Sequence, residues 1–138
     1  MGTALRVLIV EDSEDDATLL LRVLQRGGYD VTHERVDTPA AMRAALEHQA
    51  WDIVISDYAM PQLDGLAALR LLKGQRLDLP FILVSGAIGE ERAVEVMKEG
   101  ARDFIAKGNW ARLVPAVERE LREAEAQRAR KRAEEAVR

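Results

Sequence analysis

Carboxylate side chains gather at two points of the chain, each directly after a short apolar run. Five of the six residues 11–16 are acidic, and they follow the run 5–10. Asp57 follows a second run, residues 53–56. Like charges a few ångströms apart repel by about 4 kcal/mol per pair at an effective dielectric constant of about 20. Because carboxylate oxygens hold hard cations such as Mg²⁺, the two acidic points together predict a divalent-cation site.

Acidic residues at the start of a helix also have a simpler explanation, because they favour its positive N-terminus. That explanation accounts for the three acids that follow Ser13, a typical helix N-cap. Glu11 and Asp12 precede the cap, so we assign them to the metal site. An aspartate after a strand often just begins a turn. Asp57 gains a functional interpretation from its expected place beside Glu11 and Asp12.

A hydroxyl and an amine follow two further apolar runs of the chain. Ser85 and Gly86 come after residues 81–84, and Lys107 comes after residues 103–106. Alone, they would be interpreted as a turn hydroxyl and a solvated lysine. In an open parallel sheet, however, the ligand site lies at the carboxyl ends of the strands. We therefore expect Ser85 and Lys107 beside Asp57, as a donor and a cation for an anionic group.

Alternating strands and helices must position these residues. Short aliphatic runs alternate with segments of helical periodicity, which predicts an α/β fold with a doubly wound parallel sheet. The five expected strands are residues 5–10, 30–36, 53–56, 81–84 and 103–106. The first is apolar except for Arg6 and is expected at the centre of the sheet. The second contains His33 and Glu34 and is expected at an edge.

Five helices are expected between and after these strands. They begin after the caps Ser13 and Thr38, cover residues 66–73, run from Glu90 to Gly100, and extend from Trp110 to Arg138. Beyond Glu123 the last helix has only alanines and Val137 between its charges. We predict a globular domain over residues 1–121 and a helical extension or connector over residues 122–138. The alternatives for this extension are a solvated, frayed helix and a coiled-coil segment.

Composition excludes several classes of protein. The chain has 138 residues, which suits one domain with a single core. It has no cysteine, which excludes disulfides, thiolate metal sites and cysteine nucleophiles. The net charge of -4 argues against a domain that grips nucleic acid. No apolar run approaches the length of about 20 residues of a membrane span, so a cytoplasmic protein without a membrane partner is expected.

The same residues resemble the receiver domains of bacterial two-component response regulators. The resemblance covers residue 5 to about residue 121. It rests on the following motifs: Glu11-Asp12, Asp57-Tyr58-Ala59-Met60-Pro61, Asp64-Gly65, Ser85-Gly86, and the segment Gly100-Ala101-Arg102-Asp103-Phe104-Ile105-Ala106-Lys107. It implies a flavodoxin-like fold, also typical of chemotaxis regulators, with strand order 2-1-3-4-5.

The resemblance also implies a site chemistry. Asp57 would accept a phosphoryl group from a sensor histidine kinase or a phosphotransfer protein. Glu11, Asp12, Asp57 and the backbone carbonyl of Ala59 would surround Mg²⁺. The protein would then be a signalling switch that assists only its own phosphorylation and dephosphorylation, and not an enzyme with a separate substrate.

The resemblance assigns the remaining residues to phosphoryl binding and switching. Ser85 and Lys107 would hold phosphoryl oxygens. Ser85 and Phe104 would move on phosphorylation and change the face formed by helix four, strand five and helix five, which controls an output partner or domain. Lys107 is followed by Gly108, where this family usually has proline in a cis bond, and a cis bond is not expected without proline.

Other functions remain open at this stage. One is a phosphatase-like hydrolase with Asp57 as nucleophile, although no general acid and no cap for a substrate is evident. Others are a flavodoxin-like cofactor binder, which the acidic first loop disfavours, and a constitutive interaction module on the receiver fold. A short apolar seam at Val114, Val117, Leu121 and Ala124 leads us to expect a weak homodimer, since basic residues continue that seam.

Overall fold

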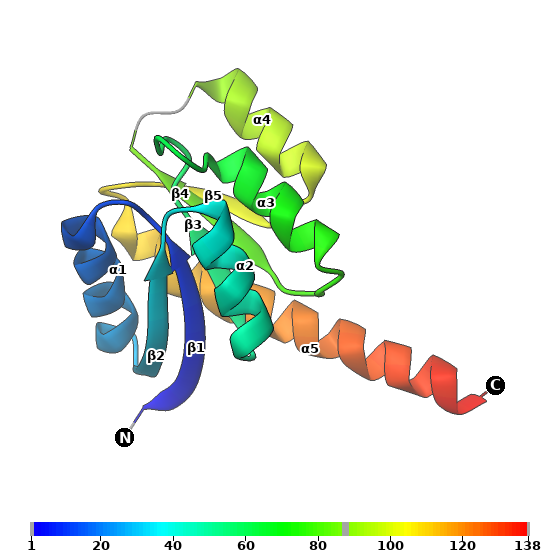
Figure 1. The fold of residues 1–138 in the computed structure, drawn as a ribbon. Coiled ribbons are helices and arrows are strands. Elements are labelled where there is room, and N and C mark those ends of the chain that lie inside the picture. Colours follow the sequence, from blue (N-terminus) through cyan, green and yellow to red (C-terminus); the bar gives the residue numbers. More distant parts are fainter. Residues whose placement is uncertain (1, 87–88, 138) are drawn as a thin grey trace.

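A computed structural model describes residues 2–86 and 89–137 of the chain. Its centre is a parallel sheet of five strands in the order β2-β1-β3-β4-β5 (Figure 1). The strands are β1 (Thr3–Val10), β2 (Tyr29–Val36), β3 (Ile53–Ser56), β4 (Phe81–Ser85) and β5 (Asp103–Ala106). The predicted fold class, strand order and edge position of β2 are confirmed. The expectation that β1 is central is wrong, because β3 occupies the middle and β1 lies between β3 and the edge strand.

Five α-helices and a 3₁₀ turn cover the two faces of the sheet. They are α1 (Glu14–Arg26), α2 (Pro39–His48), α3 (Gly65–Gly74), α4 (Glu90–Glu99), the turn η1 (Trp110–Arg112) and α5 (Leu113–Val137). Helices α1 and α5 pack on one face, and α2, α3 and α4 on the other. The chain from Trp110 therefore begins as a 3₁₀ turn and becomes α-helical only at Leu113, which corrects the expected helix start. Arg138, the expected helix end, lies outside the described residues.

Side-chain caps fix where the helices begin. The Ser13 hydroxyl accepts a hydrogen bond from the backbone N–H of Asp16 at 3.2 Å. Thr38 accepts from Ala41 N–H at 3.1 Å in the same way. Each cap satisfies a backbone donor that the first helical turn leaves without a partner. The strand ends and helix starts at the upper edge of the sheet are therefore held in place locally.

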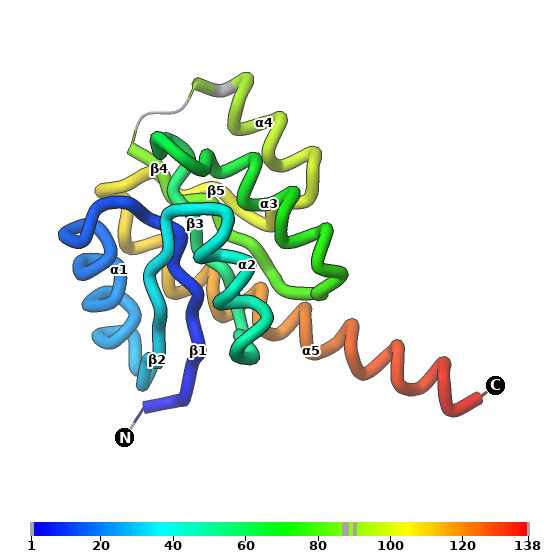
Figure 2. Tube along the Cα trace, in the orientation of Figure 1, coloured from blue at the N-terminus to red at the C-terminus, as the bar shows by residue number. Residues whose placement is uncertain are grey.

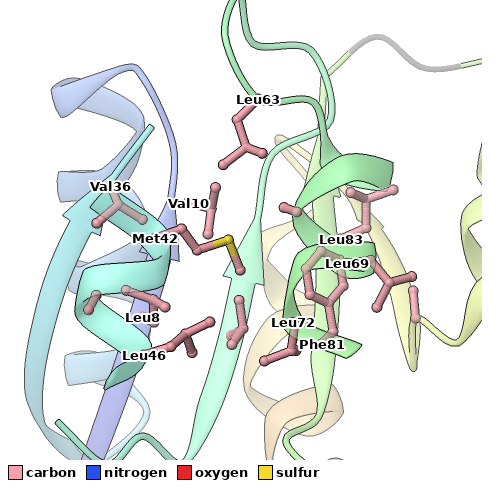
Figure 3. Close-up of a cluster of buried hydrophobic side chains, with 14 of the residues drawn as sticks. Leu8, Val10, Val36, Met42, Leu46, Leu63, Leu69, Leu72, Phe81 and Leu83 are labelled. Atoms are coloured by element: carbon pink, nitrogen blue, oxygen red, sulfur yellow. The ribbon is translucent and has the colours of Figure 1, made fainter. Parts of the chain in front are cut away.

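Apolar side chains on both faces of the central strands form two core layers. In β1, Leu8 and Val10 belong to the layer under α2 and α3, whereas Val7 and Ile9 belong to the layer under α1 and α5. Figure 3 shows the first layer, in which Met42 and other side chains of α2 and α3 point onto the strands. Burial on both faces is typical of parallel strands with helical crossovers. The core thereby gives the strand ends a rigid base.

Helix α5 extends beyond the rest of the molecule. Its first turns bury Leu113, Ala116 and Val117 against the sheet. Its last turns, in orange and red, project away from the rest of the molecule toward the lower right of the view (Figure 2). Among the described residues, no helix is both long enough and apolar enough to cross a membrane.

Candidate functional site

Backbone hydrogen bonds bring the carboxyl ends of three neighbouring strands together. Asp57 N–H donates to the carbonyl of Val10 at 2.8 Å, and Glu11 N–H donates to the carbonyl of Val36 at 2.9 Å. As a result, oxygen atoms of Glu11, Asp12 and Asp57 lie within 4.8 Å of one another. The three carboxylates that the sequence singles out therefore form one cluster. The cluster lies at the upper edge of the sheet, where the helices that follow β1 and β3 begin.

Two of these carboxylates are buried although they carry negative charge. Glu11 is 5% exposed and Asp57 is 8% exposed. Burial, together with repulsion from Asp57, raises the pKa of Glu11 to about 7, although contacts with Lys107 pull it downward. Near neutral pH, Glu11 is thus poised between its charged and neutral forms. Such a site favours a cation that neutralises the cluster.

Lys107 provides positive charge inside the cluster. Its Nζ lies 2.8 Å from Glu11 Oε1, 2.6 Å from Asp16 Oδ2 and 3.3 Å from Asp57 Oδ2. Burial lowers the pKa of Lys107, but the hydrogen bonds to Asp16 and Glu11 outweigh burial and raise this pKa above its ordinary value. The ammonium group therefore stays charged at neutral pH. The predicted convergence of Lys107 on Asp57 is present in the structure.

Asp16 is a partner of Lys107 that the sequence interpretation missed. We expected it only to stabilise the N-terminus of its helix. Its side chain instead makes the shortest of the three contacts with Lys107 and lines a small cavity shared with Asp57 and Trp110. The signal in the sequence is its position in the first turn of the helix that follows Glu11 and Asp12. Such a side chain can turn back toward the strand ends.

Arg35 is a second residue that the interpretation missed. It lies on β2, next to the carboxyl end of that edge strand. Its guanidinium donates to the backbone carbonyl of Glu11 at 3.1 Å and contacts Glu14 at 3.3 Å. The sequence predicts this strand only at an edge of the sheet and indicates no site residue on it. Its cation nevertheless braces the loop that carries the acid pair.

Ser85 and Lys107 meet through their backbones. Ser85 ends β4 and is 2% exposed, and its carbonyl accepts a hydrogen bond from Lys107 N–H at 3.0 Å. The parallel register pairs Ser85 with Ala106, the residue before Lys107. Both predicted phosphoryl-binding residues therefore lie at adjoining strand ends. Ser85 ends β4, the neighbour of the strand that precedes Asp57, and Lys107 follows β5, the next strand along the sheet.

The loop after Asp57 is held close to the start of α3. Ala59, the predicted carbonyl ligand, is exposed in this loop. Gly65 N–H donates to the carbonyl of Tyr58 at 2.9 Å. A Cβ at Gly65 would lie 2.9 Å from the Asp57 carbonyl oxygen and 2.8 Å from Leu83 Cδ1. Only glycine allows this approach, so Gly65 fixes the path of the backbone that carries Ala59.

Phe104 lies away from the acid cluster. It is half-buried and packs against the core under α2, α3 and α4, and its carbonyl accepts a hydrogen bond from Arg112 at 3.1 Å. The structure thus places Phe104 on β5, between the helices of the predicted output face. A switching movement of its ring remains a prediction.

The turn after Lys107 is formed without proline. All peptide bonds between described residues are trans, as expected from Gly108. Gly108 has φ +95°, and Asn109 N–H donates to the carbonyl of Ala106 at 2.9 Å. Glycine adopts this positive φ without strain, so it closes a tight turn. Lys107 consequently reaches Asp57 from a backbone with a trans peptide bond after the lysine, whereas this family usually has a cis bond to proline there.

The cluster suits a hard divalent cation. Its side-chain donors are carboxylate oxygens, which Mg²⁺ prefers, and no sulfur or imidazole ligand is among them. Glu11, Asp12 and Asp57 would hold the cation, and the carbonyl of Ala59 remains a predicted fourth ligand. A doubly wound sheet with this acidic pocket and a lysine at its carboxyl edge defines a receiver-type signalling domain.

Comparison with known proteins assigns the family. The profile of the response regulator receiver domain matches residues 7–118. The chain therefore belongs to the response regulator receiver domain family of two-component systems. The predicted hydrolase and the constitutive interaction module are not favoured. Proteins of this family are generally signalling domains and not classical enzymes, and they act with histidine kinases and output domains.

Relatives and solved structures agree with this assignment. The response regulator protein FleR of Pseudomonas aeruginosa is 36% identical over 79% of this chain, which spans 23% of FleR. The transcriptional regulatory protein DctD of Rhizobium meliloti is 37% identical over 78% of this chain, again 23% of that protein. The receiver domain of a histidine kinase from Syntrophus aciditrophicus superposes with a TM-score of 0.73 at 35% identity, covering 86% of this chain and 91% of that one. The chain thus spans about a quarter of the length of FleR and of DctD.

Proposed function

We propose that Asp57 is the phospho-acceptor of this receiver domain and takes a phosphoryl group from the phosphohistidine of a sensor kinase or a phosphotransfer protein. The observation that carries the proposal is the contact of Asp57 Oδ2 with Lys107 Nζ at 3.3 Å, inside a pocket that also holds Glu11 and Asp12. A buried nucleophile beside a fixed ammonium group suits an incoming anionic phosphoryl group.

The residues of the site divide the work of phosphoryl transfer. Asp57 Oδ1 accepts a hydrogen bond from Tyr58 N–H at 2.8 Å, which orients the carboxylate. A lone pair of Asp57 attacks phosphorus, the phosphorus–nitrogen bond breaks, and the leaving imidazole keeps the electron pair. Lys107 and Ser85 then donate to phosphoryl oxygens. Mg²⁺, when bound, would neutralise the dispersed charge of the transition state.

The output follows from the position of β5 between two helices. On phosphorylation, Ser85 and Phe104 would shift and change the face formed by α4, β5 and α5. This face would control an output partner or a fused output domain, with residues 1–121 as the receiver and residues 122–138 as the connector. The greater length of the regulators FleR and DctD supports such an arrangement. The domain would work in the cytoplasm and assist only its own phosphorylation and dephosphorylation.

Phosphorylation by a small donor tests the proposal directly. The purified chain is incubated with acetyl phosphate and Mg²⁺, and its intact mass is measured. We expect one added phosphoryl group in the wild type, none in Asp57→Asn, and a strong reduction when a chelator removes the metal. Equal incorporation in Asp57→Asn, or full incorporation in the presence of chelator, contradicts the assignment.

A further inference from the structure

Lys107 is shared between carboxylates of two kinds. Glu11 and Asp57 belong to the cluster that suits a divalent cation. Asp16 does not belong to that cluster, yet its Oδ2 makes the shortest contact with Lys107 Nζ, at 2.6 Å. Asp16 is also the most accessible of the three, because 37% of its side chain is exposed, against 7% for Glu11 and 9% for Asp57. The ammonium group therefore has one partner outside the metal cluster.

This arrangement creates a competition for the buried oxygens. In the structure, Lys107 Nζ contacts one oxygen atom of Glu11 and one of Asp57, two of the three carboxylates that would hold a divalent cation. An ammonium group and a dication a few ångströms apart repel each other, so a bound cation weakens the contacts of Lys107 with these two carboxylates. Asp16 does not belong to the metal cluster, so it becomes the main carboxylate partner of Lys107.

The backbone of Asp16 is held in place by the start of a helix. Asp16 N–H donates to the Ser13 hydroxyl at 3.2 Å, and the residue lies in the first turn of α1. Lys107 is followed by Gly108 and has a long, flexible side chain. A fixed carboxylate can therefore define where this side chain rests.

We propose that Asp16 is a positioning residue that holds Lys107 Nζ beside the pocket while a divalent cation is bound by Glu11, Asp12 and Asp57. The proposal rests on the proposed function, and it adds a partner for the lysine in the metal-loaded site. Because Nζ lies 3.3 Å from Asp57 Oδ2 in the resting site, this position keeps the ammonium group within reach of a phosphoryl group on Asp57.

The proposal predicts that Asp16 strengthens metal binding through Lys107. Without the cation, Lys107 contacts three carboxylates, so Glu11 and Asp57 partly compensate for the loss of Asp16. With the cation bound, the contacts of Lys107 with Glu11 and Asp57 are weakened, so the loss of Asp16 is compensated less. Removing Asp16 should therefore weaken the loaded state more than the empty state.

Binding of Mn²⁺, followed by electron paramagnetic resonance of the free ion, tests this prediction. Mn²⁺ takes the same oxygen ligands as Mg²⁺ and is counted directly. We expect Asp16→Asn to raise the dissociation constant about tenfold, which corresponds to about 1.4 kcal/mol. The matched control is Asp15→Asn, which removes the same charge from the neighbouring, exposed position of the same helical turn. We expect at most a threefold effect from it.

A second pair of variants shows whether the effect passes through the lysine. In a Lys107→Met background, Asp16→Asn should have no larger effect than Asp15→Asn. If Asp16→Asn and Asp15→Asn are equivalent in the wild-type background, or if the tenfold effect persists without Lys107, the proposal is wrong. Thermal melts verify folding, and Asp16→Ser removes the same contact should Asp16→Asn fail to fold.

Labelling with acetyl phosphate on the same samples separates the two proposals. If the wild type neither binds Mn²⁺ nor is labelled at Asp57, the proposed function is wrong. If the wild type does both and Asp16→Asn behaves like Asp15→Asn, only the role of Asp16 is wrong.

Discussion

At the scale of single residues, the site is a balance of buried charges. Lys107 contacts three carboxylates, and burial together with Asp57 raises the pKa of one of them, Glu11, to about 7. An acid cluster of this kind costs stability unless a cation neutralises it. Lys107 supplies part of that neutralisation in the resting site. Its removal should therefore change metal binding and phosphoryl handling more than folding.

Replacing Lys107 by alanine tests this balance. The side chain lies at a strand end and is 20% exposed, so Lys107→Ala should keep a cooperative melt. Since the ammonium group no longer competes for Glu11 and Asp57, Mg²⁺ should raise the melting temperature of the variant more than that of the wild type. Scanning calorimetry with and without Mg²⁺ measures the difference. Loss of the cooperative melt in Lys107→Ala, with no added stabilisation by Mg²⁺, would make the lysine structural.

A second ion pair, at the opposite edge of the sheet, gives a pH prediction. Asp52 accepts hydrogen bonds from the backbone N–H of Arg6 at 2.8 Å and from its guanidinium at 2.9 Å. Burial acts to raise the pKa of Asp52, but the Arg6 hydrogen bonds outweigh it and hold this pKa below its ordinary value. A carboxyl group whose pKa is lower in the folded state stabilises the fold above its unfolded pKa of about 3.9 and loses that contribution as the pH falls through the folded value.

Asp52→Asn should therefore destabilise the protein at pH 7, by about 1 kcal/mol or less for a partly exposed pair. The difference from the wild type should shrink below about pH 4 and disappear at lower pH. Urea unfolding at a series of pH values measures it. A difference that stays constant down to pH 2 would show that the charge of Asp52 is not responsible.

At the scale of elements, the start of α3 packs closely against the loop that follows Asp57. Gly65 brings the first turn of α3 into contact with the carbonyl of Asp57 and with Leu83 of β4. The N-cap Asp64 accepts a hydrogen bond from Ala67 N–H at 2.8 Å and fixes the same turn. The loop that follows Asp57 is thus positioned by a helix start, and not by the sheet alone.

Gly65→Ala should disturb both stability and the site. Its new methyl group would lie under 3.0 Å from the backbone of Asp57, which cannot move freely, and crowding of this kind costs about 1–3 kcal/mol. The matched control is Gly74→Ala at the exposed end of the same helix, where a Cβ would meet nothing within 4 Å. That change should be neutral or stabilise the protein by about 0.4–1 kcal/mol. Equal free energies of unfolding for the two variants would contradict the role of Gly65.

At the scale of the whole molecule, α5 joins the compact body to an exposed tail. Its buried residues end at Glu120, a charged side chain that contacts Arg119 Nε at 3.0 Å. Arg119 also binds Asp103 of β5 at 2.7 Å. Ala124 and Arg128 are half-buried, and every later described residue is exposed. At about 1.5 Å per residue, the 25 residues of α5 extend over about 38 Å, well past the sheet.

Truncation tests what the exposed part of α5 contributes. A chain that stops after Arg128 should melt like the full chain, since the removed residues are exposed. A chain that stops after Arg122 should melt a few degrees lower, because it loses the half-buried Ala124 and Arg128. Identical melting temperatures for all three chains would show that the residues of α5 after Arg122 do not stabilise the fold.

Sedimentation of the same chains tests self-association. We expect weak, concentration-dependent dimerisation of the full chain that the chain ending at Arg122 loses, because a mostly charged helix without an apolar stripe frays unless a partner holds it. Identical monomeric behaviour at all concentrations, with and without phosphorylation, would make residues 122–138 a passive linker.

The sequence by itself determined the elements, their order and the chemistry at the strand ends. Apolar runs of four to eight residues are buried on both faces in a parallel sheet, so Glu11, Asp57, Ser85 and Lys107 are assigned to one edge by periodicity alone. Caps such as Ser13 act within one helical turn, so they can be predicted from neighbouring residues in the sequence. Only the tertiary structure brought Asp16 to Lys107 and Arg35 to the acid loop. These contacts join residues 91 and 24 positions apart, and they depend on how helices and strands pack, which local pattern does not encode.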